Sequence, residues 1–224
     1  MLDRQVRKRI DPWLEAPARR LAAAGVSANV VSLMGFFLGM AGCVAVASQY
    51  YLAGLALILA NRLADGLDGC VARCSRATDV GGFLDIVLDL IFYGGVPFAF
   101  AVAQPEALLP AGFLVWSFLG TTGSFLAFAV IDARRGVTSD RLGGKSFFYH
   151  AGLMEGTETV LFFTLFCLFP QHFATLAWIF GALCWLTVAV RITAGVAAFR
   201  PPERQYGVRE GAPAARPSAH EAAP

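Results

Sequence analysis

Apolar residues follow one another in long runs over most of the chain, and polar residues gather between the runs. Six runs stand out, at 28–48, 50–73, 82–103, 107–131, 151–170 and 173–198. A helix of about 20 residues rises 1.5 Å per residue and crosses about 30 Å of hydrocarbon. The runs do not alternate as barrel strands do, and a helix satisfies its own backbone groups in lipid. The pattern predicts an all-α integral membrane bundle of six transmembrane helices.

The composition supports a membrane protein. The chain is 57% hydrophobic and 15% charged, whereas a soluble domain is about 25% charged, so a water-soluble enzyme and a disordered chain are excluded. The net charge of +2 is too small to indicate a partner, and no nucleic acid is expected. Five cysteines form no paired framework, so no disulfide is expected. Because the first long apolar run starts near residue 28, we expect no cleavable signal peptide.

The connections between the runs are of two kinds. Those at 48–50, 104–106 and 170–172 are short and carry no lysine or arginine. Loop cations are confined to the other connections and the two ends: Arg4, Arg7, Lys8, Arg9, Arg19, Arg20, Arg73, Arg76, Arg134, Arg135, Arg141, Lys145, Arg200, Arg204, Arg209 and Arg216. The positive-inside rule therefore predicts that both termini and the basic connections lie in the cytoplasm.

The two ends of the chain differ from the bundle. Residues 1–27 have apolar positions at helical spacing opposite a basic face, which favours an amphipathic helix lying on the membrane. A helix packed on the protein with a solvated outer face is the alternative. Residues 28–200 form the predicted transmembrane domain. Residues 201–224 contain Pro, Ala, Arg and Glu with almost nothing to bury, so we expect a disordered cytoplasmic tail.

Four aspartates interrupt the second and third apolar runs. Asp65 and Asp68 are three residues apart and Asp85 and Asp89 are four apart, so each pair shares one helix face. A short connection makes the two helices antiparallel, and the four carboxylates converge at about the same depth. Carboxylates in lipid indicate a functional site, and a divalent cation is the simplest way to neutralise them. An all-oxygen set favours Mg²⁺ or Mn²⁺ over zinc, and two such ions suit phosphoryl chemistry.

The residues around the aspartates favour a bulky phosphorylated ligand. Gly69 and Ala72 lie on the face of Asp65 and Asp68, and small side chains let a ligand approach the backbone. Arg73 offers a planar fork for phosphate oxygens.

These residues form the stretch Asp65-x-x-Asp68-Gly69-x-x-Ala72-Arg73 followed by Gly81-x-x-x-Asp85-x-x-x-Asp89. The stretch resembles the signature of the CDP-alcohol phosphotransferases, most of all the YnjF-type bacterial inner-membrane branch. The resemblance covers roughly residues 1–200. It implies transfer of a phosphatidyl or phospho-alcohol group from a cytidine diphosphate donor to an alcohol, with release of CMP. The chain departs from the signature in having seven residues between Arg73 and Gly81 where the family has eight.

The resemblance implies roles position by position. Asp65, Asp68, Asp85 and Asp89 would bind two Mg²⁺ or Mn²⁺ ions, and Asp89 would also be the general base. Contacts to the CDP moiety are implied for these residues: Asn29, Val30, Val31, Ser32, Gly69, Ala72, Arg73 and Thr78. For Ser27, Asn29 and Ser32, helix capping is the alternative. The resemblance further implies a homodimer in the bacterial inner membrane with a cytoplasmic active site.

Several assignments stay open from the sequence. Lys145 and Arg191 are candidates for binding a phosphate on the acceptor, and surface charge or snorkelling is the alternative. Arg62, three residues before Asp65, is predicted to offset the carboxylates. CDP-diacylglycerol with a small alcohol acceptor is the preferred substrate pair, and a CDP-linked headgroup with a lipid acceptor is the alternative. A small cation transporter and an inactive scaffold are the competing functions.

Overall fold

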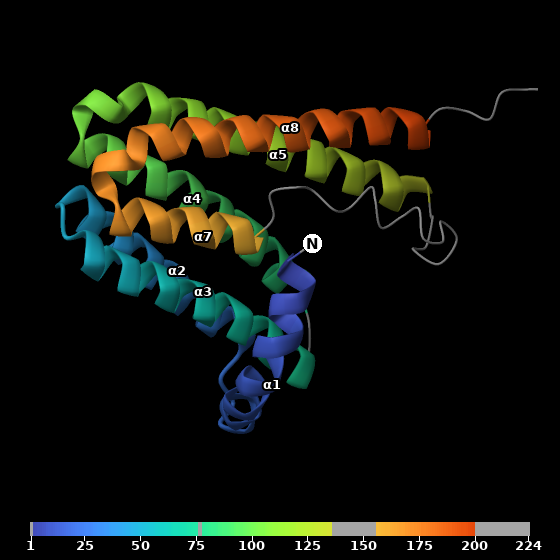
Figure 1. The fold of residues 1–224 in the computed structure, drawn as a ribbon. Coiled ribbons are helices and arrows are strands. Elements are labelled where there is room, and N and C mark those ends of the chain that lie inside the picture. Colours follow the sequence, from blue (N-terminus) through green and yellow to red (C-terminus); the bar gives the residue numbers. More distant parts are fainter. Residues whose placement is uncertain (1, 76–77, 136–155, 200–224) are drawn as a thin grey trace, which may run out of the picture.

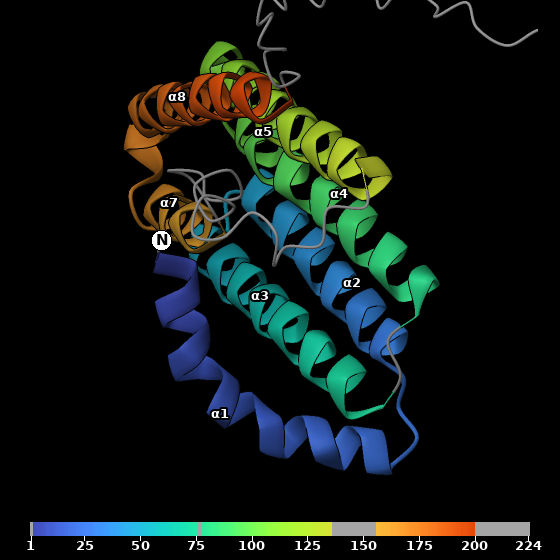
Figure 2. The same cartoon turned by 90° about the vertical axis from the view of Figure 1, so that its right-hand side faces the viewer.

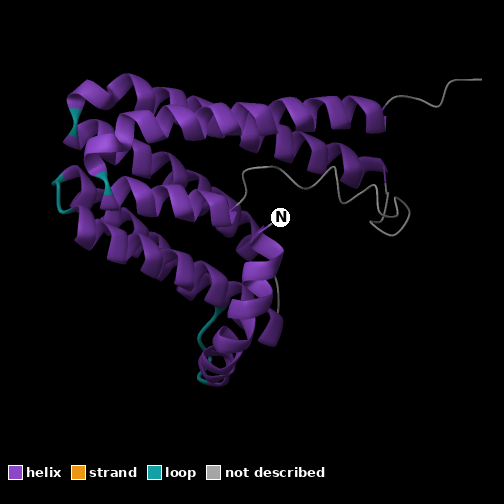
Figure 3. Ribbon diagram, in the orientation of Figure 1, coloured by secondary structure: helices purple, strands orange, loops and turns teal. Residues whose placement is uncertain are grey.

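The computed structural model describes residues 2–75, 78–135 and 156–199, and every regular element in them is helical (Figure 3). The elements, in chain order, are α1 (Leu2–Ala23), α2 (Ala28–Ala47), α3 (Tyr51–Cys74), α4 (Asp79–Ala103), the 3₁₀ turn η1 (Pro105–Ala107), α5 (Leu108–Arg135), α7 (Gly156–Leu168), the 3₁₀ turn η4 (Pro170–His172) and α8 (Phe173–Phe199). The predicted all-α class is confirmed.

The helices form a bundle that α1 crosses at one end (Figures 1 and 2). Helix α2 packs against α3 and α4, α7 lies beside α3, and α5 pairs with α8. Figure 1 shows α5 and α8 running together, away from α2 and α3, toward the end where α1 lies.

The three connections without lysine or arginine lie together at the other end of the bundle. The Gln104 side chain donates hydrogen bonds to the Tyr51 hydroxyl at 3.2 Å and to the Pro170 carbonyl at 3.0 Å. The Gln49 side chain donates to the Ala103 carbonyl at 3.2 Å. These bonds join the α2–α3, α4–α5 and α7–α8 connections, so the sequence correctly placed all three on one side.

An aromatic core fills the half of the bundle that contains these three connections. Phe100 of α4 stacks on Phe173 of α8 at 4.3 Å between ring centroids, and Phe162 of α7 stacks on Phe180 of α8 at 4.2 Å. Phe166 of α7 meets Phe173 edge to face. Such ring pairs add to the stabilisation from burial and fix α4, α7 and α8 relative to one another, leaving the half of α3 and α4 nearer α1 for polar residues.

Helix α1 packs on the end of α3 through one face. Leu14 and Leu21 contact a small cluster that contains the fully buried Ala18 together with Val31 and Val71. Trp13 on another face is 82% exposed. One face of the helix thus packs on the bundle, and its placement on a membrane surface stays a prediction.

Four helical segments are long and apolar enough to cross a membrane: Ala28–Ala47, Asp79–Ala103, Pro105–Arg134 and Pro170–Phe199. Helix α3 has the length but carries Arg62, Asp65, Asp68 and Arg73. Helix α7 has 13 residues, and residues 151–155 of the predicted fifth run lie outside the described residues. The predicted spans thus overlap helices α2, α3, α4, α5, α7 and α8, and the count of six remains a prediction.

Two glycines let α2 and α3 approach closely. A Cβ atom on Gly54 would lie 2.5 Å from Cγ2 of Val46 and 3.2 Å from the Gly42 carbonyl oxygen, and one on Gly42 would lie 3.2 Å from the Gly54 carbonyl oxygen. A backbone atom cannot move aside as a flexible side chain can. Small residues serve this purpose at membrane helix contacts, and here they set the spacing of the two helices.

We predict that Gly54→Ala destabilises the protein by about 1–3 kcal/mol, because the added methyl group overpacks this contact. Gly112→Ala on α5 is the matched control, since a Cβ atom there meets nothing within 4 Å, and alanine favours a helix over glycine. Thermal unfolding in detergent measures both. An unchanged midpoint for Gly54→Ala would contradict the close contact.

Candidate active site

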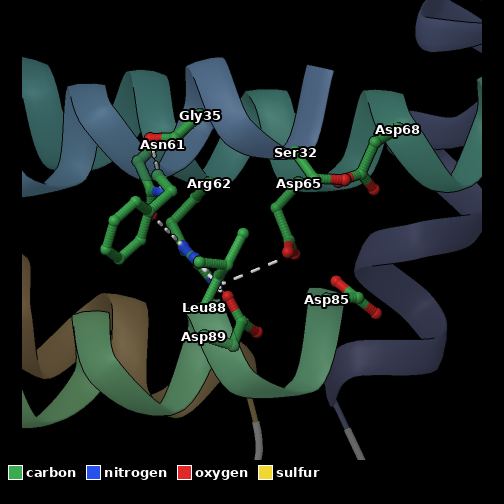
Figure 4. A pocket seen from close by; sticks show the side chains of 10 residues that line it. Ser32, Gly35, Asn61, Arg62, Asp65, Asp68, Asp85, Leu88 and Asp89 are labelled. Atoms are coloured by element: carbon green, nitrogen blue, oxygen red, sulfur yellow. Dashed lines mark hydrogen bonds and ion pairs between the residues drawn. The ribbon is translucent and has the colours of Figure 1, made fainter. Parts of the chain in front are cut away.

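Helices α3 and α4 bring the aspartates together as their spacing predicted. Asp65 and Asp68 on α3 face Asp85 and Asp89 on α4 across the space between the helices (Figure 4). One carboxylate oxygen from each of Asp65, Asp68 and Asp85 lies within 4.8 Å of the other two. Asp89 stands outside this group of three, which is hereafter called the carboxylate triad.

The four aspartates lie in one pocket together with residues of α2. Its lining is Ser32, Gly35, Phe36, Asn61, Arg62, Asp65, Asp68, Asp85, Leu88 and Asp89. Asp68 is buried, Asp65 and Asp89 are half-buried and Asp85 is exposed. The pocket therefore has a closed side near Asp68 and an accessible side near Asp85.

The triad fits a hard divalent cation. Carboxylate oxygens are the ligands that Mg²⁺ and Mn²⁺ prefer, and three of them converge without a histidine or thiol in the group. Three like charges so close repel one another, and a cation among them removes that repulsion.

Asp89 forms an ion pair with Arg62, which lies next to Asp65 of the triad. Nη2 of Arg62 donates to Oδ1 of Asp89 at 2.7 Å, and Nη1 lies 3.4 Å from Oδ2. The same Nη1 is 3.7 Å from Oδ2 of Asp65. The Arg62 side chain is only 10% exposed. Arg62 thus offsets the carboxylates, as predicted.

Three residues that the sequence analysis did not select hold Arg62 in place. Nε of Arg62 donates to Oδ1 of Asn61 at 2.7 Å, and Nη1 donates to the Tyr93 hydroxyl at 2.8 Å. The guanidinium also lies over the Phe92 ring, 4.6 Å from its centroid. Tyr93 follows Asp89 by four residues, the same spacing that linked Asp85 to Asp89, so helical periodicity offered a signal for it.

Ser32 connects α2 to the triad. Its hydroxyl contacts the Asp68 carboxylate and also the Ala28 carbonyl oxygen one turn back, at 3.1 Å. Asn61 completes the link between the helices by donating to the Gly35 carbonyl oxygen at 2.8 Å. The helix-capping alternative applies instead to Ser27, which precedes α2 and accepts from the Val30 amide.

Other residues expected at the CDP moiety lie near the start of α4. Thr78 caps this helix by accepting from the Gly81 amide at 3.1 Å. A Cβ atom on Gly81 would lie 2.8 Å from Oδ1 of Asn29, so the beginnings of α2 and α4 are in close approach. Val30 is exposed, whereas Val31 is buried against α1 and α3, which makes Val31 a packing residue.

The remaining candidates that the structure describes are not among the residues that line the pocket. Gly69 and Ala72 are half-buried on α3, and Nη2 of Arg73 contacts the Cys70 sulfur at 3.0 Å. Arg191 on α8 donates to the Thr121 carbonyl oxygen of α5 at 3.0 Å. Lys145 lies outside the described residues.

Comparison with known proteins shows the family of the chain. Residues 25–193 match the family described as CDP-alcohol phosphatidyltransferase. The chain is 48% identical to the inner membrane protein YnjF of Escherichia coli over 92% of its own length and 100% of that protein. It is 25% identical to a phosphatidylcholine synthase of Mesorhizobium japonicum, over 93% of this chain and 72% of the relative.

The fold is also that of a solved enzyme. The crystal structure of the Mycobacterium tuberculosis phosphatidylinositol phosphate synthase PgsA1, with CDP-DAG bound, matches with a TM-score of 0.60 at 22% identity, over 82% of this chain and 93% of the other. With the match to the family over most of the chain, the helical fold and the signature aspartates lead to one conclusion. The chain belongs to the CDP-alcohol phosphatidyltransferase family and is a membrane-bound transferase of phospholipid biosynthesis.

Proposed function

We propose that the protein transfers a phosphatidyl group from CDP-diacylglycerol to a small alcohol and releases CMP. The observation that carries the proposal is the carboxylate triad, with Asp89 beside it in one pocket. The family match supports the reaction class, and the CDP-DAG bound to the PgsA1 relative supports the donor.

The residues have separate tasks in the proposed reaction. Asp65, Asp68 and Asp85 would hold divalent Mg²⁺ or Mn²⁺, two ions by resemblance, with Asp89 as a further ligand of the second. When bound, such ions stabilise negative charge on the diphosphate and on the departing CMP. Ser32 holds the Asp68 carboxylate in place through its hydroxyl.

Asp89 acts as the general base. It takes the proton from the acceptor hydroxyl while the acceptor oxygen forms a bond to the phosphorus next to the diacylglycerol. The bond between that phosphorus and the bridging oxygen breaks, and its electron pair leaves with CMP. An in-line displacement of this kind needs the acceptor and CMP on opposite sides of the phosphorus.

Contacts to the donor are proposed for two groups of residues. Asn29, Ser32 and Thr78 lie at the closely packed beginnings of α2 and α4, and Gly69, Ala72 and Arg73 lie on the last turns of α3. Val30 and Val31 would contribute through the backbone. Lys145 and Arg191 are proposed to bind a phosphate on the acceptor.

We propose six spans with both termini and the site on the cytoplasmic side. The three connections without lysine or arginine lie at the end of the bundle remote from the pocket, which supports this orientation through the positive-inside rule. Helix α1 would lie on the inner surface of a bacterial inner membrane. A homodimer is proposed from the family resemblance.

We predict that Asp89→Asn lowers CMP release by at least about 100-fold, because general base catalysis contributes that much. Purified protein in detergent is supplied with CDP-diacylglycerol, Mn²⁺ and a panel of alcohols. Glu106→Gln is the control: it neutralises an exposed carboxylate in η1, beside the remote connections, and it retains full activity.

The same assay separates the alternatives. Acceptor-dependent CMP release identifies the alcohol. No release with CDP-diacylglycerol, but release from a CDP-linked headgroup with a lipid acceptor, would reverse the substrate roles. If folded protein released no CMP from either donor class, it would be an inactive scaffold.

We also predict that chelation abolishes CMP release and that Mg²⁺ or Mn²⁺ restores it. Asp85→Asn should raise the Mn²⁺ concentration for half-maximal activity by about tenfold, since one charged ligand of the triad is lost. A metal titration of the wild-type and Asp85→Asn proteins measures this. Equal half-maximal concentrations would rule out Asp85 as a ligand.

A further inference from the structure

Arg62 is the feature of the pocket that the proposed reaction does not yet use. Among the described residues that line the pocket, it is the one cation against four carboxylates. It is also nearly buried, with 10% of its side chain exposed. A buried charge costs free energy unless it is paired, so we ask what Arg62 contributes to the site.

The contacts of Arg62 constrain its guanidinium from several directions. Asn61 and Tyr93 accept hydrogen bonds from Nε and Nη1, and the Phe92 ring lies 4.6 Å away. The planar fork then presents Nη2 and Nη1 to the two oxygens of Asp89, at 2.7 and 3.4 Å. An arginine fork of this kind fixes both the distance and the plane of a carboxylate, which a lysine does not.

The pairing divides the four carboxylates into two kinds. Asp65, Asp68 and Asp85 form the triad, whereas Asp89 is turned to Arg62. A carboxylate oxygen has two lone pairs, so Asp89 can accept from Arg62 and still take a proton from a hydroxyl. The positive charge also lies 3.7 Å from Asp65 of the triad, where it opposes a bound cation.

The geometry points to Arg62 as a positioning residue that orients Asp89 as the base at the edge of the carboxylate triad. The role rests on the proposed function and adds a residue to it. Arg62 acts through Asp89 and does not itself touch a reacting atom. The positive charge of Arg62 lowers the affinity of the site for a metal ion. Its guanidinium at the same time fixes the orientation of the base.

The test measures metal binding and turnover separately. Mn²⁺ binding to the purified protein without nucleotide is titrated by electron paramagnetic resonance, and CMP release is measured with the donor and acceptor found above. The variants are Arg62→Gln, which removes the charge, and Arg62→Lys, which keeps the charge but lacks the fork. Arg19→Gln, at an exposed pair with Glu15 on α1, is the control. Thermal midpoints in detergent show that each variant is folded.

We predict opposite effects for Arg62→Gln. Mn²⁺ binding tightens by at least about threefold, because a nearby positive charge is removed. The kcat falls by about 10- to 100-fold, because the base is no longer held in place, and the donor KM changes by less than about threefold. Arg62→Lys binds Mn²⁺ as the wild type does and regains part of the lost kcat. Tyr93→Phe, which loses one anchor, changes kcat in the same direction but less.

A merely structural role would weaken Mn²⁺ binding and turnover together, in step with a lower thermal midpoint, and that result overturns the proposal. Unchanged Mn²⁺ binding and kcat in folded Arg62→Gln would overturn it as well. If the wild-type protein released no CMP with either donor class, the proposed function would fail and the positioning role with it. The Mn²⁺ titration would still measure whether the guanidinium opposes a cation, so the two failures are distinguishable.

Discussion

The mutual repulsion of four carboxylates between two apolar helices is the constraint on which the site depends. Charges in such a place must be paired. Arg62 pairs with Asp89 at 2.7 Å and approaches Asp65 at 3.7 Å, so one cation faces four carboxylates in the pocket. A divalent cation completes the balance. The charge that makes the site costly to fold is therefore also what suits it to a divalent metal ion.

The bundle provides the rigidity that this balance requires. The register of α2 and α3 is fixed by their close contact at Gly42 and Gly54. Stacked phenylalanines fix α4, α7 and α8 in the half of the bundle remote from the pocket. Ser32 and Asn61 then connect α2 to the site through Asp68 and the Gly35 carbonyl. Asp68 is contacted from α2 by Ser32, and Asp89 is contacted from α3 by Arg62, so each of these two carboxylates is held by a residue of a second helix.

Much of this site could be predicted from spacing alone. The separations of Asp65 from Asp68 and of Asp85 from Asp89, with an antiparallel pair of helices, were enough to place them together. The position of Asp89 could not be predicted, because the choice between Arg62 and the triad depends on side-chain rotamers and on the register of α3 and α4. The packing of the Val31 side chain against α1 could not be predicted either, because the family resemblance gives its position in the chain and not the direction of its side chain; its contact to the nucleotide stays a prediction.

Asp65, Asp68 and Asp85 are proposed to form a divalent metal site, with the base Asp89 at its edge and paired to Arg62. Anomalous diffraction from crystals of the protein grown with Mn²⁺ tests it most directly. The account predicts a manganese peak coordinated by one oxygen from each of the three aspartates, with Asp89 still paired to Arg62. A manganese peak elsewhere in the protein, or none among the three carboxylates at saturating Mn²⁺, would contradict it.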